Sequence, residues 1–588
     1  MADPVARRVR TQRAWDALFL FVALAMAAIF TTHYQMGFRL DDVLLMDWAR
    51  THSPLDAFSP EAGQIVNSVR PVFALTAWVL THTAGWQHPF WWQLTLTVTL
   101  LTGLAFAGLT ARYIAGRWYS LQISIALYFL VFTSILNVFF WYSDLTYGLE
   151  LAFTTPAWYF GLRGLYEGRL KYWLLGMLFG SLAILSKEPA VVLVHVVLLG
   201  SLAVEWRRII ELWRVRSRAQ QVAAIVAYAV LIFVTIYIVE ISPTRTNRFL
   251  SLNASDLGYF IRDRINYYSS IYLSIGARIL LFFPIVSAAM SAALRTRFNR
   301  NAPADFLWIS VLALVAALLL FSNLLIALPL LTFAMLSIAV YPNPELTRAR
   351  RLLPFLASLL LAAGTLLFTI QLVKTQLTEV AILTSIIAAW GWCIWAEELA
   401  ALLRPWMARR QFRALAYALL ALFVIGGAVG SLPRIENQER LLRAVRDVRQ
   451  NANDAIQWAA FHLPHGSLFA VTTYSLHGIE ELTSLTSSSD ETKLRDQYTF
   501  SGGFVYYYLD QIGRRDIVHA YLEDSEIAPL VLAAMRRESH SYLFLQSAPD
   551  LLLFHGDASH PPLLASSDLL VASFNRGQYP CEIWMIKN

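Results

Sequence analysis

The sequence predicts a polytopic α-helical membrane protein that ends in a soluble α/β domain. The 588 residues are 57% hydrophobic and only 15% charged, whereas a soluble domain carries about 25% charged residues. Apolar runs of about 20 residues recur as far as residue 430 or so, and runs of this length cross a bilayer as helices. After Pro433 the composition changes to that of a soluble segment.

The apolar runs indicate about 13 transmembrane segments. These segments should be helices, because lipid cannot provide hydrogen-bond partners for open backbone groups. Residues 172–204 divide at Lys187-Glu188, because either charge at mid-bilayer would cost roughly 2.5–3.5 kcal/mol. Residues 306–340, a run of 35, are too long for one crossing and divide at Ser322-Asn323. Residues 71–85 are too short to cross and predict an interfacial or re-entrant helix. The predicted spans are 15–31, 90–110, 120–139, 148–162, 172–186, 190–204, 222–241, 271–294, 306–321, 324–340, 352–373, 379–397 and 414–432.

Basic residues divide unequally between the two sides of this arrangement. The inner loops hold 24 of them and the outer loops nine, as the positive-inside rule requires of a chain whose N-terminus is cytoplasmic. The same rule accounts for the net charge of +7 without nucleic acid as a partner. We expect an integral plasma (inner) membrane protein with a cytoplasmic N-terminus at 1–14, a transmembrane domain at 15–432 and an extracytoplasmic domain at 433–588.

The segment after Pro433 reads as a mixture of helices and strands. Residues 434–463 are charged and amphipathic, which predicts a helix, and residues 527–538 predict another. Residues 467–475 and 540–556 are rich in apolar and aromatic side chains and predict strands. These elements indicate a soluble α/β domain of about 150 residues.

Acidic and basic residues gather on the predicted outer face, although the positive-inside rule places most basic residues on the inner side. The acidic pair Asp41-Asp42 begins a long outer loop at 33–89, which also contains Arg70-Pro71. Paired carboxylates outside a membrane are either ordinary solvated loop residues or part of an active site. The other outer candidates are Asp144, the turn residues Lys187 and Glu188, and four arginines in the loop 242–270, namely Arg245, Arg248, Arg262 and Arg264.

Four motifs in this order resemble those of the GT-C superfamily of integral membrane glycosyltransferases. They are "LDD" after the first span, "VRPVFAL" in the first loop, "WYSDLTYG" after the third span, and "AILSKEPAVVL". The last looks like the Lys-Glu turn of TMTC-type and related O-mannosyltransferase-like members. The tail lacks a WWD-type motif and TPR-like repeats, so the chain departs from the oligosaccharyltransferase and TMTC patterns there.

The resemblance implies an enzyme that moves a sugar from a polyprenyl-phosphate-linked donor to a glycan, lipid or protein acceptor on the extracytoplasmic face. Such a transfer needs a base for the acceptor hydroxyl and positive charge for the departing phosphate. The catalytic candidates are Asp41 as base, Asp42 as the residue that orients the acceptor or a divalent cation (Mg²⁺ or Mn²⁺), and Asp144. The donor-phosphate candidates are Arg70, Lys187, Glu188, Arg245, Arg248, Arg262 and Arg264.

Two other functions are compatible with the sequence. A transporter or flippase of lipid-linked glycans would favour ionisable residues at mid-membrane and two related halves, whereas the charges here lie at span ends. A non-enzymatic membrane assembly or sensor protein would tolerate loss of Asp41 and Asp42. Nucleotide-sugar use has no support, because the sequence contains neither a P-loop nor a GxGxxG motif.

Overall fold

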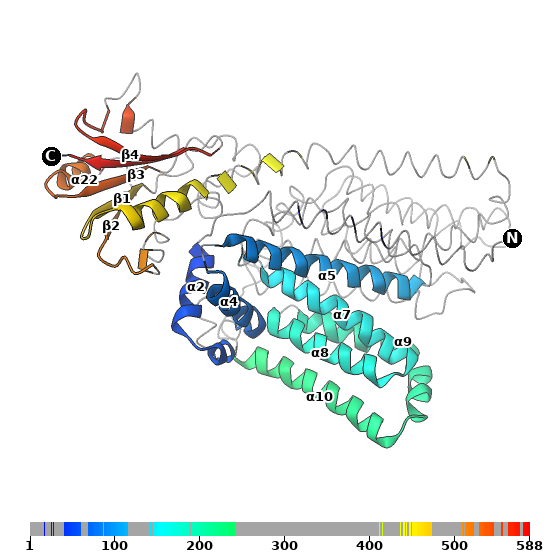
Figure 1. The fold of residues 1–588 in the computed structure, drawn as a ribbon. Coiled ribbons are helices and arrows are strands. Elements are labelled where there is room, and N and C mark those ends of the chain that lie inside the picture. Colours follow the sequence, from blue (N-terminus) through cyan, green and yellow to red (C-terminus); the bar gives the residue numbers. More distant parts are fainter. Residues whose placement is uncertain are drawn as a thin grey trace, which may run out of the picture.

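A computed structural model gives the fold of the chain (Figure 1). It describes residues 40–59, 69–85, 88–115, 145–187, 190–241, 450–472, 512–522, 528–545, 554–556, 562–576 and 580–587, together with isolated residues at 17, 21, 25, 28, 142, 411, 414, 436, 439, 440, 443, 446, 447, 505, 509 and 510.

Five of the predicted spans fall within helices of the structure, which confirms their helical state. These helices are α5 (Pro89–Ala115), α7 (Leu145–Glu167), α8 (Leu170–Ser186), α9 (Ala190–Arg214) and α10 (Arg218–Ile241). Among the described residues, Pro89–Thr110 and Arg218–Ile238 are long and apolar enough to cross a membrane. The other eight predicted spans lie outside the described residues, apart from isolated positions, so the number 13 stays a prediction.

The predicted break at Lys187-Glu188 is confirmed. Helix α8 ends at Ser186 with Lys187 as its C-cap in an extended conformation, and α9 begins at Ala190. The Lys187 backbone N–H donates to the Ala183 carbonyl (3.0 Å), which closes the last turn of α8. The two apolar runs are therefore separate helices.

The helices pack closely because small residues face one another. A Cβ atom added to Gly176 of α8 would lie 2.6 Å from the backbone nitrogen of Gly161 in α7. One added to Gly164 of α7 would lie 2.6 Å from the backbone nitrogen of Trp173 in α8. Small residues at such contacts let helix backbones approach, which is the common way for helices to associate in lipid.

Replacing Gly176 by alanine should therefore lower the melting temperature of the purified protein in detergent. The new methyl group has to displace backbone rather than a flexible side chain, and such overpacking costs about 1–3 kcal/mol. Leu178→Ala is the matched control on the same helix, because Leu178 is 54% exposed. If both variants melt at the wild-type temperature, the close α7–α8 contact is wrong.

Helices α9 and α10 are joined by a histidine within the apolar bundle. His195 of α9 lies 2.7 Å from the Thr235 hydroxyl through Nε2 and 3.3 Å from the Tyr228 hydroxyl through Nδ1. Both partners belong to α10. The imidazole thus satisfies its polar atoms inside the bundle and ties two neighbouring helices together.

Two short helices lie across one end of the bundle (Figure 1). They are α2 (Leu40–Thr51) and α4 (Pro71–Thr83), with the 3-10 helix η1 (Pro54–Phe58) between them. Helix α4 packs against α2, η1 and α8. The short helix predicted over 71–85 is thus present, and most of its apolar side chains are covered by protein.

The C-terminal segment forms a five-stranded mixed sheet in the order β2-β1-β3-β5-β4. Strand β1 (Leu468–Thr472) pairs in parallel with β2 (Val518–Leu522) and β3 (Ser541–Leu545). Strand β5 (Cys581–Ile586) pairs antiparallel with β3 and with β4 (Leu569–Phe574). The predicted helix at 527–538 is α22 (Ala528–Met535), and the predicted strand at 467–475 contains β1. Residues 540–556 contain β3, but 554–555 are helical.

Two arginines secure the elements around this sheet. Arg514 donates to the Leu463 carbonyl (2.9 Å) and pairs with Asp516 (2.9 Å), which joins the end of the helix at 450–462 to the start of β2. Arg536, just after α22, pairs with the buried Asp568 (3.2 Å). These contacts tie the helices to the sheet edges, so the C-terminal segment has a core and polar network of its own. Its boundary at 433 and its extracytoplasmic side stay predictions.

Candidate functional site

The acidic pair lies in the first turn of α2. The Asp42 side chain is completely buried, with 0% exposure. The Asp41 side chain lies outside the described residues. Successive residues of a helix point about 100° apart, so the two carboxylates take different directions. A buried carboxylate has no direct path to a substrate hydroxyl and fits a positioning role better than that of a base.

Helix α2 is held in place by α4. Trp48 of α2 and Ala74 of α4 belong to one buried apolar cluster, which Trp78 of α4 covers. The Trp78 indole N–H donates to the His52 carbonyl at 3.1 Å, just past the end of α2. The two helices therefore form one packed unit at the end of the bundle.

Arg70 begins α4, as the Arg-Pro sequence predicts. It is the N-cap residue and is partly exposed, and Pro71 occupies the first helical position, where its missing N–H costs nothing. The same loop is also bonded to α10. The Tyr237 hydroxyl, near the end of α10, donates to the Phe58 carbonyl of η1. The loop that carries Asp42 and Arg70 is thus fixed to α8 and α10.

Lys187 is buried at the end of α8, with 1% exposure. Its ammonium nitrogen lies 3.0 Å from the ring centroid of Tyr147, in the first turn of α7. A buried cation is costly unless it is compensated, and an aromatic face in a desolvated setting supplies about 2 kcal/mol of compensation. This ammonium is therefore a fixed positive charge close to the end of the bundle.

Two further polar residues of this region were not predicted. Glu150 lies one turn after Tyr147 on α7 and is 4% exposed. Gln93 in the first turns of α5 is completely buried, and within the described part of the chain neither polar atom of its amide makes a hydrogen bond. The sequence could have pointed to both residues, because an acid or an amide inside an apolar run of a membrane helix indicates a functional site.

The structure brings three predicted site residues onto contacting elements. Asp42 lies on α2, Arg70 at the start of α4 and Lys187 at the end of α8, and α4 packs against both other helices. The remaining predictions are tested by nothing in the described residues. These are the side chain of Asp41, and Asp144, Glu188, Arg245, Arg248, Arg262 and Arg264.

Comparisons with known proteins give structural neighbours of low similarity. No protein-family model and no curated protein matches the chain. Two crystal structures of ArnT from Cupriavidus metallidurans, one bound to undecaprenyl phosphate and one in the apo state, align with 97% of this chain and 98% of their own. Each is 14% identical, with a TM-score of 0.32. At that TM-score the alignment assigns neither a fold nor an activity, so both rest on the residues described above.

The possible cation ligand Asp42 has few neighbours of the right kind. Within the described ranges, no group of three or more His, Cys, Asp or Glu side chains lies close enough to hold a metal ion. The other predicted acids, Asp41 and Asp144, have side chains outside those ranges. Binding of Mg²⁺ or Mn²⁺ by Asp42 therefore stays a prediction, and no chemical step below depends on it.

Asp47 in the first loop interacts electrostatically with residues of the C-terminal segment. Partial burial raises the pKa of the Asp47 carboxyl on α2, and the nearby Asp510 carboxylate raises it further, while Arg50, His52 and Arg515 act in the opposite direction. Asp510 and Arg515 belong to the C-terminal segment, so α2 lies within electrostatic range of it. By contrast, the Ser53 backbone N–H donates to Asp56 (2.7 Å) and lowers the pKa of that carboxyl.

These opposite shifts predict opposite effects of pH in two neighbouring variants. Ionised Asp47 is disfavoured in the folded state, so Asp47→Asn should raise the melting temperature at pH 7, with a gain that shrinks as the pH falls toward 4. Ionised Asp56 is favoured, so Asp56→Asn should lower the melting temperature at pH 7, with a loss that persists as the pH falls to about 4 and shrinks only below it. Thermal scans of both variants from pH 4 to 8 check the signs, and two shifts of the same sign would contradict the assignment.

Proposed function

We propose that the chain is an integral membrane glycosyltransferase that moves a sugar from a polyprenyl-phosphate-linked donor to an acceptor on the extracytoplasmic face. The observation that carries the proposal is Lys187, a buried cation at a helix break, on an element that packs against the loop of Asp42. A fixed cation in a site of low polarity suits the departing phosphate of such a donor. A nearby acidic pair suits the acceptor hydroxyl.

The proposed reaction exchanges one bond at the anomeric carbon for another. The bond from the sugar C1 to the phosphate oxygen breaks, and the bonding pair leaves with the polyprenyl phosphate. The acceptor oxygen bonds to C1, and its proton passes to Asp41. Asp42, whose side chain is completely buried, is the residue that we assign to positioning the acceptor or the α2 backbone. Positive charge at Lys187 and Arg70 offsets the charge that develops on the leaving phosphate.

Further donor contacts are proposed for the remaining candidates. Arg245, Arg248, Arg262 and Arg264 supply guanidinium groups, which match phosphate oxygens in two-point contacts. Glu188 follows Lys187 in the turn and would orient a neighbouring cation. Asp144 precedes α7, the helix that carries Tyr147, and would contact the sugar or the acceptor.

The decisive experiment is a transfer assay with the full-length protein in proteoliposomes. A panel of polyprenyl-phosphate-linked sugars, including undecaprenyl-phosphate forms, is offered with glycan, lipid and protein acceptors, and release of free polyprenyl phosphate is measured. We expect release with at least one donor, and its loss in the double variant Asp41→Asn/Asp42→Asn. Asp56→Asn serves as the control, because Asp56 is an acidic residue of the same loop whose carboxylate bonds to the Ser53 backbone N–H and has no assigned part in the transfer.

The same vesicles separate this function from transport. A transporter or flippase would move the lipid-linked glycan between leaflets without breaking the sugar–phosphate bond. Leaflet movement in the presence of every acceptor, with no polyprenyl phosphate released from any donor, would refute the transferase proposal.

A further inference from the structure

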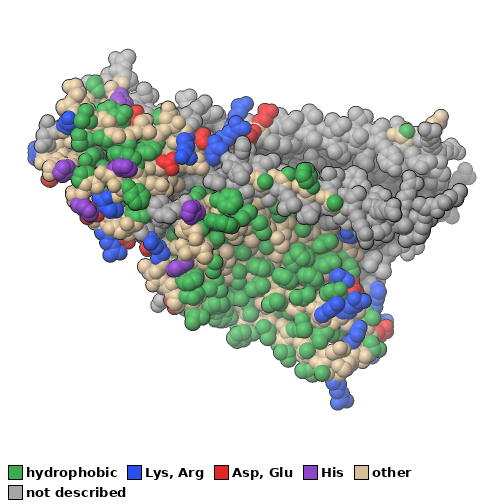
Figure 2. Space-filling model, in the orientation of Figure 1, with side chains coloured by type: hydrophobic (Ala, Val, Ile, Leu, Met, Phe, Trp, Pro, Cys, Tyr) green, Lys and Arg blue, Asp and Glu red, His purple; other side chains and the backbone are tan. Residues whose placement is uncertain are grey.

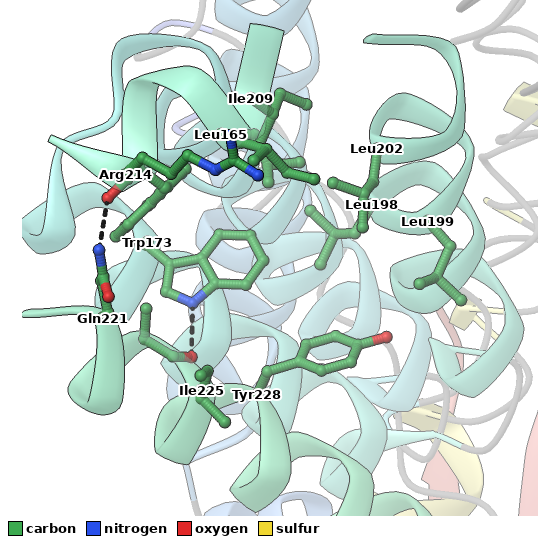
Figure 3. Close-up of a pocket in the computed structure, with 13 residues that line it drawn as sticks. Leu165, Trp173, Leu198, Leu199, Leu202, Ile209, Arg214, Gln221, Ile225 and Tyr228 are labelled. Carbon is green, nitrogen blue, oxygen red and sulfur yellow. Dashed lines mark hydrogen bonds between the residues drawn. The ribbon is translucent and has the colours of Figure 1, made fainter. Parts of the chain in front are cut away.

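An apolar cavity lies at the end of the bundle where α9 ends and α10 begins, far along the helices from Lys187. Its volume is about 450 Å³, within the range of roughly 300–1,000 Å³ that holds small ligands. Figure 3 shows Trp173, Ile225 and Tyr228 on one side of it and Leu198, Leu199 and Leu202 on the other. The cavity thus lies among α8, α9 and α10.

Two polar side chains of the cavity wall, Trp173 and Gln221, bond to backbone carbonyls of the protein. The Trp173 indole N–H donates to the Ala224 carbonyl at 2.9 Å, and the Gln221 amide donates to the Trp213 carbonyl at 3.0 Å (Figure 3). The ring centroids of Trp173 and Trp213 lie 6.4 Å apart in an edge-to-face arrangement. The surface that remains for a ligand is aromatic and aliphatic, which suits a hydrocarbon chain.

The cavity opens on the apolar side of the bundle. Leu199, Leu202 and Ile225 at its edge are 48%, 36% and 69% exposed. Figure 2 shows hydrophobic side chains covering much of the visible face of the helical bundle. In a membrane-spanning bundle such a face meets lipid tails, so a chain can enter the cavity from the bilayer without crossing water.

One end of the cavity is basic. Arg214 lines it, and Figure 3 shows its side chain extending over the apolar residues. The surrounding stretch 206–218 contains five arginines and one glutamate, and Figure 2 shows the basic side chains gathered at this end. The sequence places this stretch in a cytoplasmic loop, where anionic headgroups attract arginine, and an interfacial indole such as Trp213 is typical of that depth.

We propose that this cavity binds one acyl chain of an anionic phospholipid of the cytoplasmic leaflet, with the lipid phosphate held by Arg214. The apolar wall accounts for the chain, and the basic rim accounts for the preference for negative charge. The proposal requires that the bundle spans a membrane, and it is independent of sugar transfer at the opposite end. The lipid would fix the α9–α10 connection and the register of these helices against α8.

Photo-crosslinking tests this proposal with the full-length protein in nanodiscs. The probe is phosphatidylglycerol with a diazirine in one acyl chain, and labelled peptides are mapped by mass spectrometry. We expect labels in the peptides that contain Trp173, Leu198–Leu202 or Ile225, with competition by unlabelled phosphatidylglycerol and much weaker competition by phosphatidylcholine. Arg214→Gln should weaken binding roughly tenfold or more, the size expected for the loss of one hydrogen bond to a charged group.

Two variants separate the cavity from general surface attraction. Arg207→Gln removes the same charge from the same basic stretch but does not line the cavity, so labelling should stay at the wild-type level. Leu202→Trp fills the opening and should reduce labelling while Arg214 is intact. Equal labelling in Arg214→Gln and Arg207→Gln, unchanged labelling in Leu202→Trp, or stronger competition by polyprenyl phosphate than by phosphatidylglycerol would each overturn the proposal.

Discussion

Replacing Asp41 by asparagine should lower the rate of sugar transfer by roughly 10²-fold or more, the usual scale for a lost general base. Asparagine keeps the shape of the side chain and removes its basicity, so the acceptor hydroxyl keeps its proton. Donor binding should be unchanged, because the base does not act on the donor phosphate. The measurement is single-turnover release of polyprenyl phosphate at saturating donor, together with donor affinity by equilibrium binding.

The neighbouring carboxylate should respond differently to the same change. Asp42 is completely buried, so Asp42→Asn should raise the KM for the acceptor, or the concentration of divalent cation required, more than it lowers kcat. The two effects distinguish the base from the positioning residue. Wild-type rates in both single variants and in the double variant would show that the pair has no part in the transfer.

Much of the fold of residues 40–241 could be predicted from hydropathy and charge. The break between α8 and α9 followed from the cost of Lys187 at mid-bilayer, and the structure places the helix end at Ser186. The apolar run at 71–85 predicted a short helix, which is α4, and its interfacial or re-entrant position stays a prediction. These predictions succeeded because the length of an apolar run and the position of a charge are local properties of the chain.

The environment of the candidate site could not be predicted in the same way. The pairing of Lys187 with the Tyr147 ring joins residues 40 positions apart and depends on how α7 packs against α8, with glycines at the contact. Asp42 is completely buried on α2, a helix that packs against α4, and this burial depends on contacts between elements rather than on the local sequence. The sequence marked both charged residues as unusual. Only the packing of the helices against one another determined that both side chains are buried.

Removing the charge of Lys187 should weaken donor binding by roughly 10- to 100-fold, the range for the loss of one contact to a charged group. Lys187→Met keeps the length and apolar character of the side chain and deletes the ammonium that we assign to the donor phosphate. The measurement is the affinity for the polyprenyl-phosphate sugar in nanodiscs. Gel filtration and a melting curve of the same preparation show whether the variant is folded.

A matched pair at Tyr147 keeps this prediction testable even if Lys187→Met fails to fold. Tyr147→Phe retains the aromatic face that lies 3.0 Å from the ammonium, so donor affinity should stay within a few-fold of the wild type. Tyr147→Leu removes that face, which contributes about 2 kcal/mol to a desolvated cation, so Lys187 should lose its fixed position and donor affinity should fall about tenfold or more. A purely structural role for the pair predicts that Tyr147→Leu lowers the melting temperature with donor affinity unchanged in the folded fraction. That outcome would remove Lys187 from the donor site.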